Sequence, residues 1–173
     1  MTNKIIGIQG DKLDKINISS DTSIFLAHEA QQLGYKIFYY TPSNLSIIKN
    51  KTYANGVFLK FNYERKKFYK IYKKQKIDVE NLKFILIRQD PPFNSEYLIT
   101  TLILDGLKKV KVINNPTAIR NVSEKLYSKH FIKYMPNTLF SNNIVEIKKF
   151  YNQNKSMIMK PINGYGGNQI HLI

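Results

Sequence analysis

The segment NLKFILIRQDPPF, residues 81–93, constrains the fold more than any other part of the sequence. Its centre, residues 84–87, is apolar without interruption, so a strand here needs neighbours covering both faces of its sheet. The run ends in Arg88, Gln89 and Asp90, and the two prolines that follow cannot extend a central strand. The segment therefore predicts a buried strand with polar side chains at the point where it ends.

Strand and helix patterns alternate through the first two thirds of the chain. Asp21 or Ser20 is suited to cap a first helix, and Gly34 to end it. The alternation predicts an α/β fold, a doubly wound sheet of about four or five mostly parallel strands. The expected strands are residues 4–10, 35–41, 81–90 and 110–114, and the expected helices are 22–33 and 95–108.

Two segments between these elements are harder to assign. Residues 45–62 hold short apolar runs separated by Asn, Lys and Gly, which indicates short strands or a hairpin. Residues 63–76, YERKKFYKIYKKQK, interleave basic and aromatic residues. As an amphipathic helix they would place Phe68, Ile71 and Tyr72 on one face, and we predict a helix there.

The pattern changes after Asn115-Pro116, which predicts a domain of residues 1–118 and the start of a second, α+β domain at 119–173. In the second domain, Asn121 with Glu124 and Asn143 with Glu146 have the spacing of capping boxes. They predict helices through about Met135 and Asn152. Short strands are expected at 137–140, at 156–160 and after the glycines near the end.

Charge and composition narrow the classes of function. A net charge of +15 would suit a nucleic-acid partner, but the lysines are spread along the chain and accompany many Asn, Ile and Tyr residues. We favour a general compositional bias over a dedicated nucleic-acid site. The chain has no cysteine and its first residues lack the apolar core of a signal peptide, so we expect a cytoplasmic protein with no membrane partner.

The segment KPINGYGGNQ, residues 160–169, is the first candidate site. It is neither a Walker P-loop nor a G-x-G-x-x-G motif, because no Gly precedes Lys-Ser and Gln169 replaces the last glycine. Its glycines let backbone N–H groups approach an anion, and Lys160 supplies a positive charge just before them. The alternative is a hairpin turn with a surface lysine.

The context of this loop resembles a known family. ILIRQDPPFNSEYL, VINNPTAIRNVSEKLYSKHF, PNTLFSNN and MIMKPINGYGG are similar, in order and spacing, to bacterial glutathione synthetase of the ATP-grasp superfamily. The resemblance covers essentially the whole chain. It implies an ATP-dependent ligase that joins γ-L-glutamyl-L-cysteine to glycine through an acyl phosphate, with Mg²⁺ offsetting the phosphate charge.

The resemblance also assigns site residues. It implies ATP-binding roles for Lys125, Lys160 and the loop of Gly164, Tyr165, Gly166 and Gly167, with Lys125 in the first turn of the helix expected after Asn121. It implies that Arg88, Asp90 and Ser23 bind the dipeptide, in a segment that also holds Ser19, Ser20 and Asp21. The alternatives are an Arg88–Asp90 pair that holds the proline turn, and N-cap duty for a serine or Asp21.

The resemblance further implies what the chain does not contain. The carboxylates that bind Mg²⁺ are expected beyond Ile173, so no metal ligand is assigned here, and no catalytic residue is assigned. We therefore expect the N-terminal portion of a longer ligase, inactive alone, with a homotetramer as the family expectation for the full length. The alternatives are another ATP-grasp carboxylate-amine ligase, or a basic α/β module that binds nucleic acid.

Overall fold

The computed structural model describes residues 4–62 and 68–173. The chain separates into two compact units, Met1–Arg120 and Asn121–Ile173, and each is described by itself. No helix among the described residues is long and apolar enough to span a membrane.

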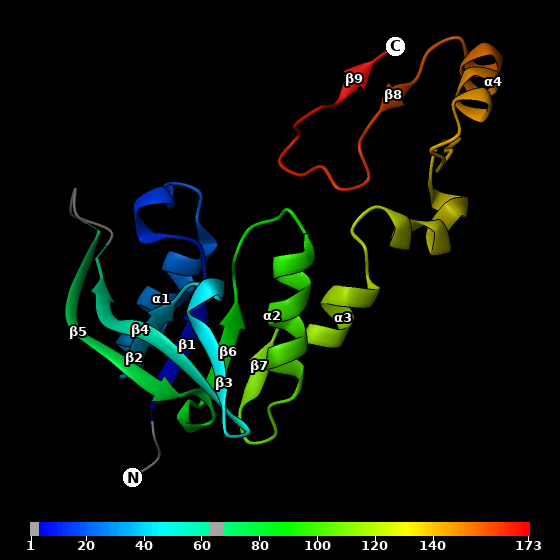
Figure 1. Cartoon of the computed structure of the whole chain (residues 1–173). Helices are drawn as coiled ribbons and strands as arrows, with labels where there is room; N and C mark the ends of the chain where they lie inside the picture. The colour runs from blue at the N-terminus through cyan, green and yellow to red at the C-terminus, as the bar shows by residue number, and fades with distance from the viewer. Residues whose placement is uncertain (1–3, 63–67) are drawn as a thin grey trace. The chain divides into compact units, whose positions relative to one another are not determined.

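The centre of the first unit is a parallel sheet (Figure 1). Strands β1 (Ile5–Gln9), β2 (Lys36–Tyr40), β6 (Phe84–Ile87) and β7 (Lys111–Ile113) lie side by side in the order β2, β1, β6, β7, and all their pairings are parallel. The connections include helices α1 (Thr22–Gln32) and α2 (Ser95–Asp105). Short 3₁₀-helices lie at Leu13–Lys15, Pro42–Asn44 and Val79–Asn81.

The two helices cover opposite faces of this sheet. Ile24 and Ala27 of α1 pack in a cluster with Ile8 of β1, whereas Leu104 of α2 packs in a second cluster with Ile85 of β6. Because side chains alternate along a strand, β1, β2 and β6 each contribute to both clusters. The predicted α/β class and its doubly wound, mostly parallel centre are therefore confirmed.

Three antiparallel strands extend the sheet beyond β2. Strand β4 (Lys51–Phe61) pairs with β2, and it also pairs with β3 (Leu45–Ile48) and β5 (Tyr69–Asp78). The predicted hairpin at 45–62 is confirmed, and the described residues form seven strands in this sheet rather than four or five.

The helix predicted at 63–76 is wrong over its described part, while residues 63–67 lie outside the described residues. Tyr69 begins β5, and Ile71 lies opposite Leu59 of β4. The ring of Phe68 stacks on that of Phe61, with centroids 6.3 Å apart. Strand pairing and these cross-strand contacts overcome the helical spacing of the apolar residues.

Gly56 offers a test of the packing of β4 against β2. A Cβ atom on Gly56 would lie 2.5 Å from Cζ of Phe38 and 2.6 Å from the backbone oxygen of Tyr39. Gly56→Ala should therefore lower the free energy of unfolding by about 1–3 kcal/mol, measured by urea titration. In the control Gly106→Ala the nearest atom lies 3.6 Å away. An equal loss in both variants would contradict this packing.

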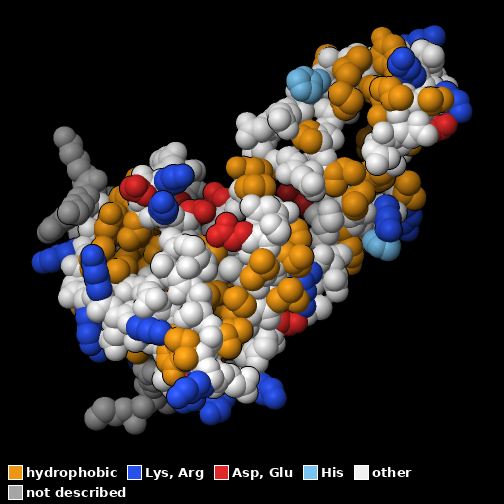
Figure 2. Space-filling view, viewed as in Figure 1, with side chains coloured by type: hydrophobic (Ala, Val, Ile, Leu, Met, Phe, Trp, Pro, Cys, Tyr) orange, Lys and Arg blue, Asp and Glu red, His pale blue; other side chains and the backbone are white. Residues whose placement is uncertain are grey.

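The second unit contains less regular structure. Helix α3 (Pro116–Asn121) leads into it, and it holds the 3₁₀-helix η4 (Leu126–Tyr134), helix α4 (Ile144–Asn154) and strands β8 (Ile158–Met159) and β9 (His171–Leu172). No side chain between residues 121 and 173 is buried, and Figure 2 shows apolar side chains on its surface.

In this unit the helix start at Asn121 and the strand at 137–140 are wrong, whereas the cap at Asn143 and the strands expected at 156–160 and after the glycines are confirmed. Asn121 ends α3 instead of starting a helix, because Pro116 begins the helix earlier and the Asn115 side chain accepts a hydrogen bond from the Ala118 N–H at 2.9 Å. Residues 137–140 form no strand. The cap at Asn143 is confirmed, since its Oδ1 accepts from the Val145 N–H at 2.9 Å.

Candidate functional site

The first candidate site lies at the carboxyl ends of β1 and β6. Arg88 follows β6, and its backbone N–H donates to the Gln9 carbonyl at 2.7 Å. Its guanidinium reaches the start of α1, where Nε donates to Oγ of Ser23 at 3.1 Å and Nη2 to Oγ1 of Thr22 at 2.5 Å. The structure thus brings together Arg88 and Ser23, which lie 65 positions apart in the sequence.

Asp21 fixes the position of Ser23. Its Oδ1 accepts hydrogen bonds from the backbone N–H groups of Ser23, at 2.6 Å, and Ile24, at 3.1 Å, so Asp21 is the N-cap of α1. Ser19 and Ser20 bond to Asn17 instead. Of the two predicted caps, Asp21 therefore has this role, and the Ser23 hydroxyl is available to Arg88.

Asp90 lies beside two other carboxylates. Its backbone N–H donates to Oδ2 of Asp11 at 2.8 Å. Burial, together with the negative charges of Asp11 and Asp21, raises the pKa of Asp90, whereas Arg88 opposes the rise. No ion pair joins Arg88 to Asp90 in the described part of the chain, so a pair of that kind does not hold the proline turn.

The raised pKa of Asp90 predicts a change of stability with pH. Protonated Asp90 stabilises the folded state at low pH, and this contribution is lost as the pH rises from the ordinary value of 3.8 through the higher folded pKa. Asp90→Asn should therefore raise the melting temperature by a small amount at pH 7, with the gain shrinking toward pH 3. Thermal unfolding across that range measures it, with Asp14→Asn as the control. If Asp90→Asn raised the melting temperature by the same amount at every pH, the gain would not come from removing the charge of Asp90 beside Asp11 and Asp21.

Sequence reasoning missed several residues of this cluster. Thr22 bonds Arg88, Asp11 bonds the backbone of Asp90, and the buried Gln9 and Gln89 side chains hydrogen-bond to each other. A signal was available, because Gln and Asp occur close together at the carboxyl ends of both neighbouring strands, as QGD and RQD. The carboxyl ends of adjacent parallel strands meet at one edge of the sheet.

The second candidate site is the glycine loop between β8 and β9. The two strands pair antiparallel, so the loop joins the arms of a hairpin. Gly166 and Gly167 have φ values of 60° and 75°, which favour glycine. The Lys125 ammonium donates to the carbonyl oxygen of Gly164. Lys160 directly follows β8 and its side chain is exposed.

The surroundings of Lys125 differ from the prediction. Lys125 precedes the 3₁₀-helix η4, and α3 has already ended at Asn121. The positive end of a helix beginning at Asn121 therefore does not assist this lysine. Its ammonium lies 3.7 Å from a carboxylate oxygen of the exposed Glu124. What the structure does provide is a direct contact between Lys125 and the glycine loop.

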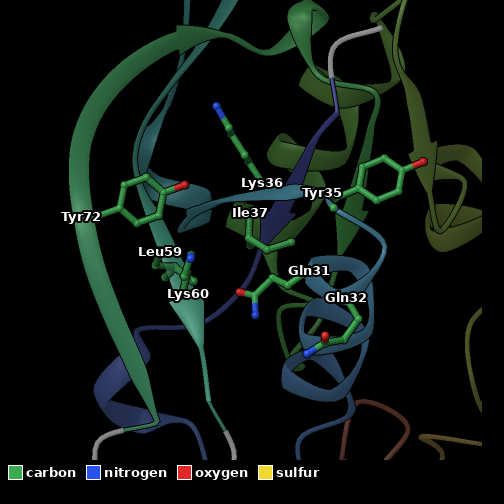
Figure 3. Close-up of a pocket in the computed structure, with 9 residues that line it drawn as sticks. Gln31, Gln32, Tyr35, Lys36, Ile37, Leu59, Lys60 and Tyr72 are labelled. Atoms are coloured by element: carbon green, nitrogen blue, oxygen red, sulfur yellow. The ribbon is translucent and has the colours of Figure 1, made fainter.

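The described residues also bear on whether either site could bind a metal ion. No group of three or more His, Asp or Glu side chains that could hold a metal ion occurs in the described ranges. The pocket in Figure 3 lies at the amino end of β2 and contains none of the predicted site residues.

Comparisons with known proteins agree with the sequence resemblance. The family model "Prokaryotic glutathione synthetase, N-terminal domain" matches residues 5–120, and "Prokaryotic glutathione synthetase, ATP-grasp domain" matches residues 124–173. Proteins named glutathione synthetase from Mesorhizobium japonicum and Salmonella typhimurium are 35% and 34% identical to this chain. The alignments cover 94% and 95% of the chain, but only 52% and 53% of those relatives.

A solved structure shares the fold at low sequence identity. The D-alanyl-alanine synthetase A of Vibrio cholerae matches with a TM-score of 0.53 and 17% identity, over 100% of this chain and 53% of that one. At this identity the likeness concerns the fold alone. The chain therefore spans about half the length of the relatives it matches, in sequence and in structure.

Proposed function

Because the chain belongs to the prokaryotic glutathione synthetase family, we propose that it forms part of an ATP-dependent ligase that joins γ-L-glutamyl-L-cysteine to glycine. The observation that carries the proposal is that the two units match, in order, the two domain models of one ligase family. The chain spans about half the length of its relatives, so the activity of the whole protein belongs to the proposal.

The Arg88 cluster is proposed to bind the dipeptide. A guanidinium offers paired N–H donors to a carboxylate, and γ-glutamylcysteine carries two carboxylates. The hydroxyls of Thr22 and Ser23 hold Arg88 in place before the substrate arrives. Asp90 and its neighbour Asp11 supply negative charge suited to the free amino group of the dipeptide.

The glycine loop and its two lysines are proposed to bind ATP. Lys125 already contacts the loop at Gly164, and Lys160 stands at its beginning, so both ammonium groups are suited to the phosphates. The positive φ values of Gly166 and Gly167 let the loop backbone, including that of Tyr165, lie close over them. Mg²⁺ generally assists such ligases, but the described residues offer no set of ligands for it, and we assign no step to a metal.

The proposed reaction has two steps. The γ-phosphoryl group of ATP passes to the cysteinyl carboxylate, giving ADP and an acyl phosphate. The glycine amine then attacks the acyl carbon, a C–N bond forms, and phosphate leaves while the amine loses its proton. In this scheme Arg88 positions the dipeptide, and Lys125 and Lys160 offset phosphate charge. The partners are small molecules, in a cytoplasmic setting.

Binding by the chain itself tests the first part of this function. We expect addition of γ-glutamylcysteine to shift the backbone NMR signals of Ser23, Arg88 and Asp90 in a saturable way. D-alanine, a substrate suited to the other class of ATP-grasp ligase, serves as the comparison ligand. Shifts at these residues with D-alanine but not with γ-glutamylcysteine would favour the other ligase class.

A further inference from the structure

Three lysines form a row across neighbouring strands of the first unit. The antiparallel register that pairs Ile37 of β2 with Leu59 of β4 places Lys36 beside Lys60, one step further along. Lys60 in turn lies directly opposite Lys70 of β5. All three side chains are exposed. Like charges directly opposite one another destabilise a sheet, so this row has an energetic cost that a bound anion would relieve.

A β-bulge directs a tyrosine to the same place. Phe58 pairs with Lys73 and Leu59 with Ile71, so Tyr72 is the extra residue on β5. Bulges of this kind change the direction of a side chain. Figure 3 shows the Tyr72 side chain extending from β5 toward the side on which Lys36 and Lys60 lie, and all three residues line the pocket. The hydroxyl is protonated at neutral pH and can donate a hydrogen bond, and partial burial raises its pKa further.

The pocket itself has the size and lining of an anion site. Its volume is about 340 Å³, within the range of small-ligand pockets. Lys36, Lys60 and Tyr72 line it, and none of its nine described lining residues is acidic. Gly34 leaves one wall open, and the Nζ atom of Lys4 lies 3.9 Å from the position a Cβ on Gly34 would take. Lys4 therefore adds a positive charge beside the two lysines that line the pocket.

We infer that this pocket binds a small molecule carrying two or more anionic groups, either phosphate or carboxylate. The pocket lies at the amino end of β2, while the proposed dipeptide site lies at the carboxyl ends of β1 and β6. It is therefore a separate site, and the inference does not rest on the proposed ligase function. The competing explanation is that the lysines only balance the negative end of α1, which finishes beside the pocket at Gln32.

NMR titration of the chain with pyrophosphate, and separately with citrate, tests the site. We expect saturable shifts of the backbone signals of Gly34, Lys60 and Tyr72. Lys60→Gln should weaken binding by about tenfold or more, because it removes the central charge of the row. Lys51→Gln removes the same charge from the other end of β4 and should change the affinity by less than about twofold. Tighter binding of pyrophosphate indicates a phosphate ligand, and tighter binding of citrate a carboxylate ligand.

Thermal unfolding provides an independent readout. Without ligand, Lys60→Gln should melt at the same temperature as the parent chain or higher, because it breaks the row of like charges. Pyrophosphate or citrate should raise the melting temperature of the parent chain more than that of the variant. The inference is overturned if neither anion shifts the pocket residues, or if Lys51→Gln weakens binding as much as Lys60→Gln. Shifts confined to Gly166 and Gly167 would also overturn it, since binding would then belong to the glycine loop.

Discussion

Replacing Arg88 with alanine should weaken the binding of γ-glutamylcysteine by about a hundredfold, close to 3 kcal/mol. The substitution removes the cation from the edge of the sheet, so the negative charges of Asp11 and Asp21 beside Asp90 are no longer opposed by Arg88. The dipeptide carboxylate then faces net negative charge. Calorimetric titration of the chain with the dipeptide measures the loss.

Two kinds of control separate binding from folding. Arg120→Ala also removes an arginine from the first unit, but Arg120 pairs with Asp105 at 2.6 Å and lies outside the Arg88 cluster, so it should leave the dipeptide affinity unchanged. Thr22→Ala and Ser23→Ala keep the guanidinium and remove its supports, and each should weaken binding by less than Arg88→Ala. An Arg88→Ala chain that folds and binds within twofold of the parent would remove this role from Arg88.

The parts of the fold that were predicted have local signals in the sequence. The uninterrupted apolar run at 84–87 predicts a covered strand, and the Asp21 and Asn143 side chains mark helix starts that the structure contains. In each case the residues that decide the structure lie within a few positions of the element they form. Because strands that are consecutive in the sequence are usually neighbours in the sheet, the alternation of strands and helices also indicates which strands lie side by side.

The missed strand β5 depends on its pairing with another strand. Residues 69–78 have a helical spacing of apolar side chains, but β4 offers a long edge, and Ile71 finds Leu59 across it. The lysine row follows from this pairing together with the pairing of β4 and β2. At Asn121 two local signals competed, and the earlier one at Pro116 prevailed because a proline suits the first position of a helix.

In the candidate sites, too, some features could be predicted from the sequence and others depend on how the chain folds. The resemblance to a known family indicated Arg88, Ser23 and the glycine loop, but no local pattern placed Arg88 against α1. That contact arises because the carboxyl end of β6 meets the amino end of a helix on the same face of the sheet. Likewise, the contact between Lys125 and Gly164 spans 39 positions and depends on how the second unit folds.

Replacing Lys160 with alanine should weaken the binding of ATP by about tenfold or more, because the loop then loses a cation that stands where its backbone begins. Lys125→Ala should have two effects. It should weaken ATP binding in a similar way, and it should also free the loop at Gly164. The loop amides of Gly164 and Asn168, which donate to backbone carbonyls, should then exchange with solvent faster even without ATP. Lys160→Ala should not produce this second effect.

The difference between the two lysine variants decides between a phosphate site and a simple turn. Lys148→Ala removes an exposed lysine from α4 in the same unit and serves as the control for general charge attraction. If all three variants weaken ATP equally, the lysines act only through net charge. If ATP leaves the signals of Gly166 and Gly167 unshifted in the parent chain, the loop is a hairpin turn. A selective loss with Lys125→Ala and Lys160→Ala, with faster loop exchange in the first alone, requires both ammonium groups to face one phosphate chain.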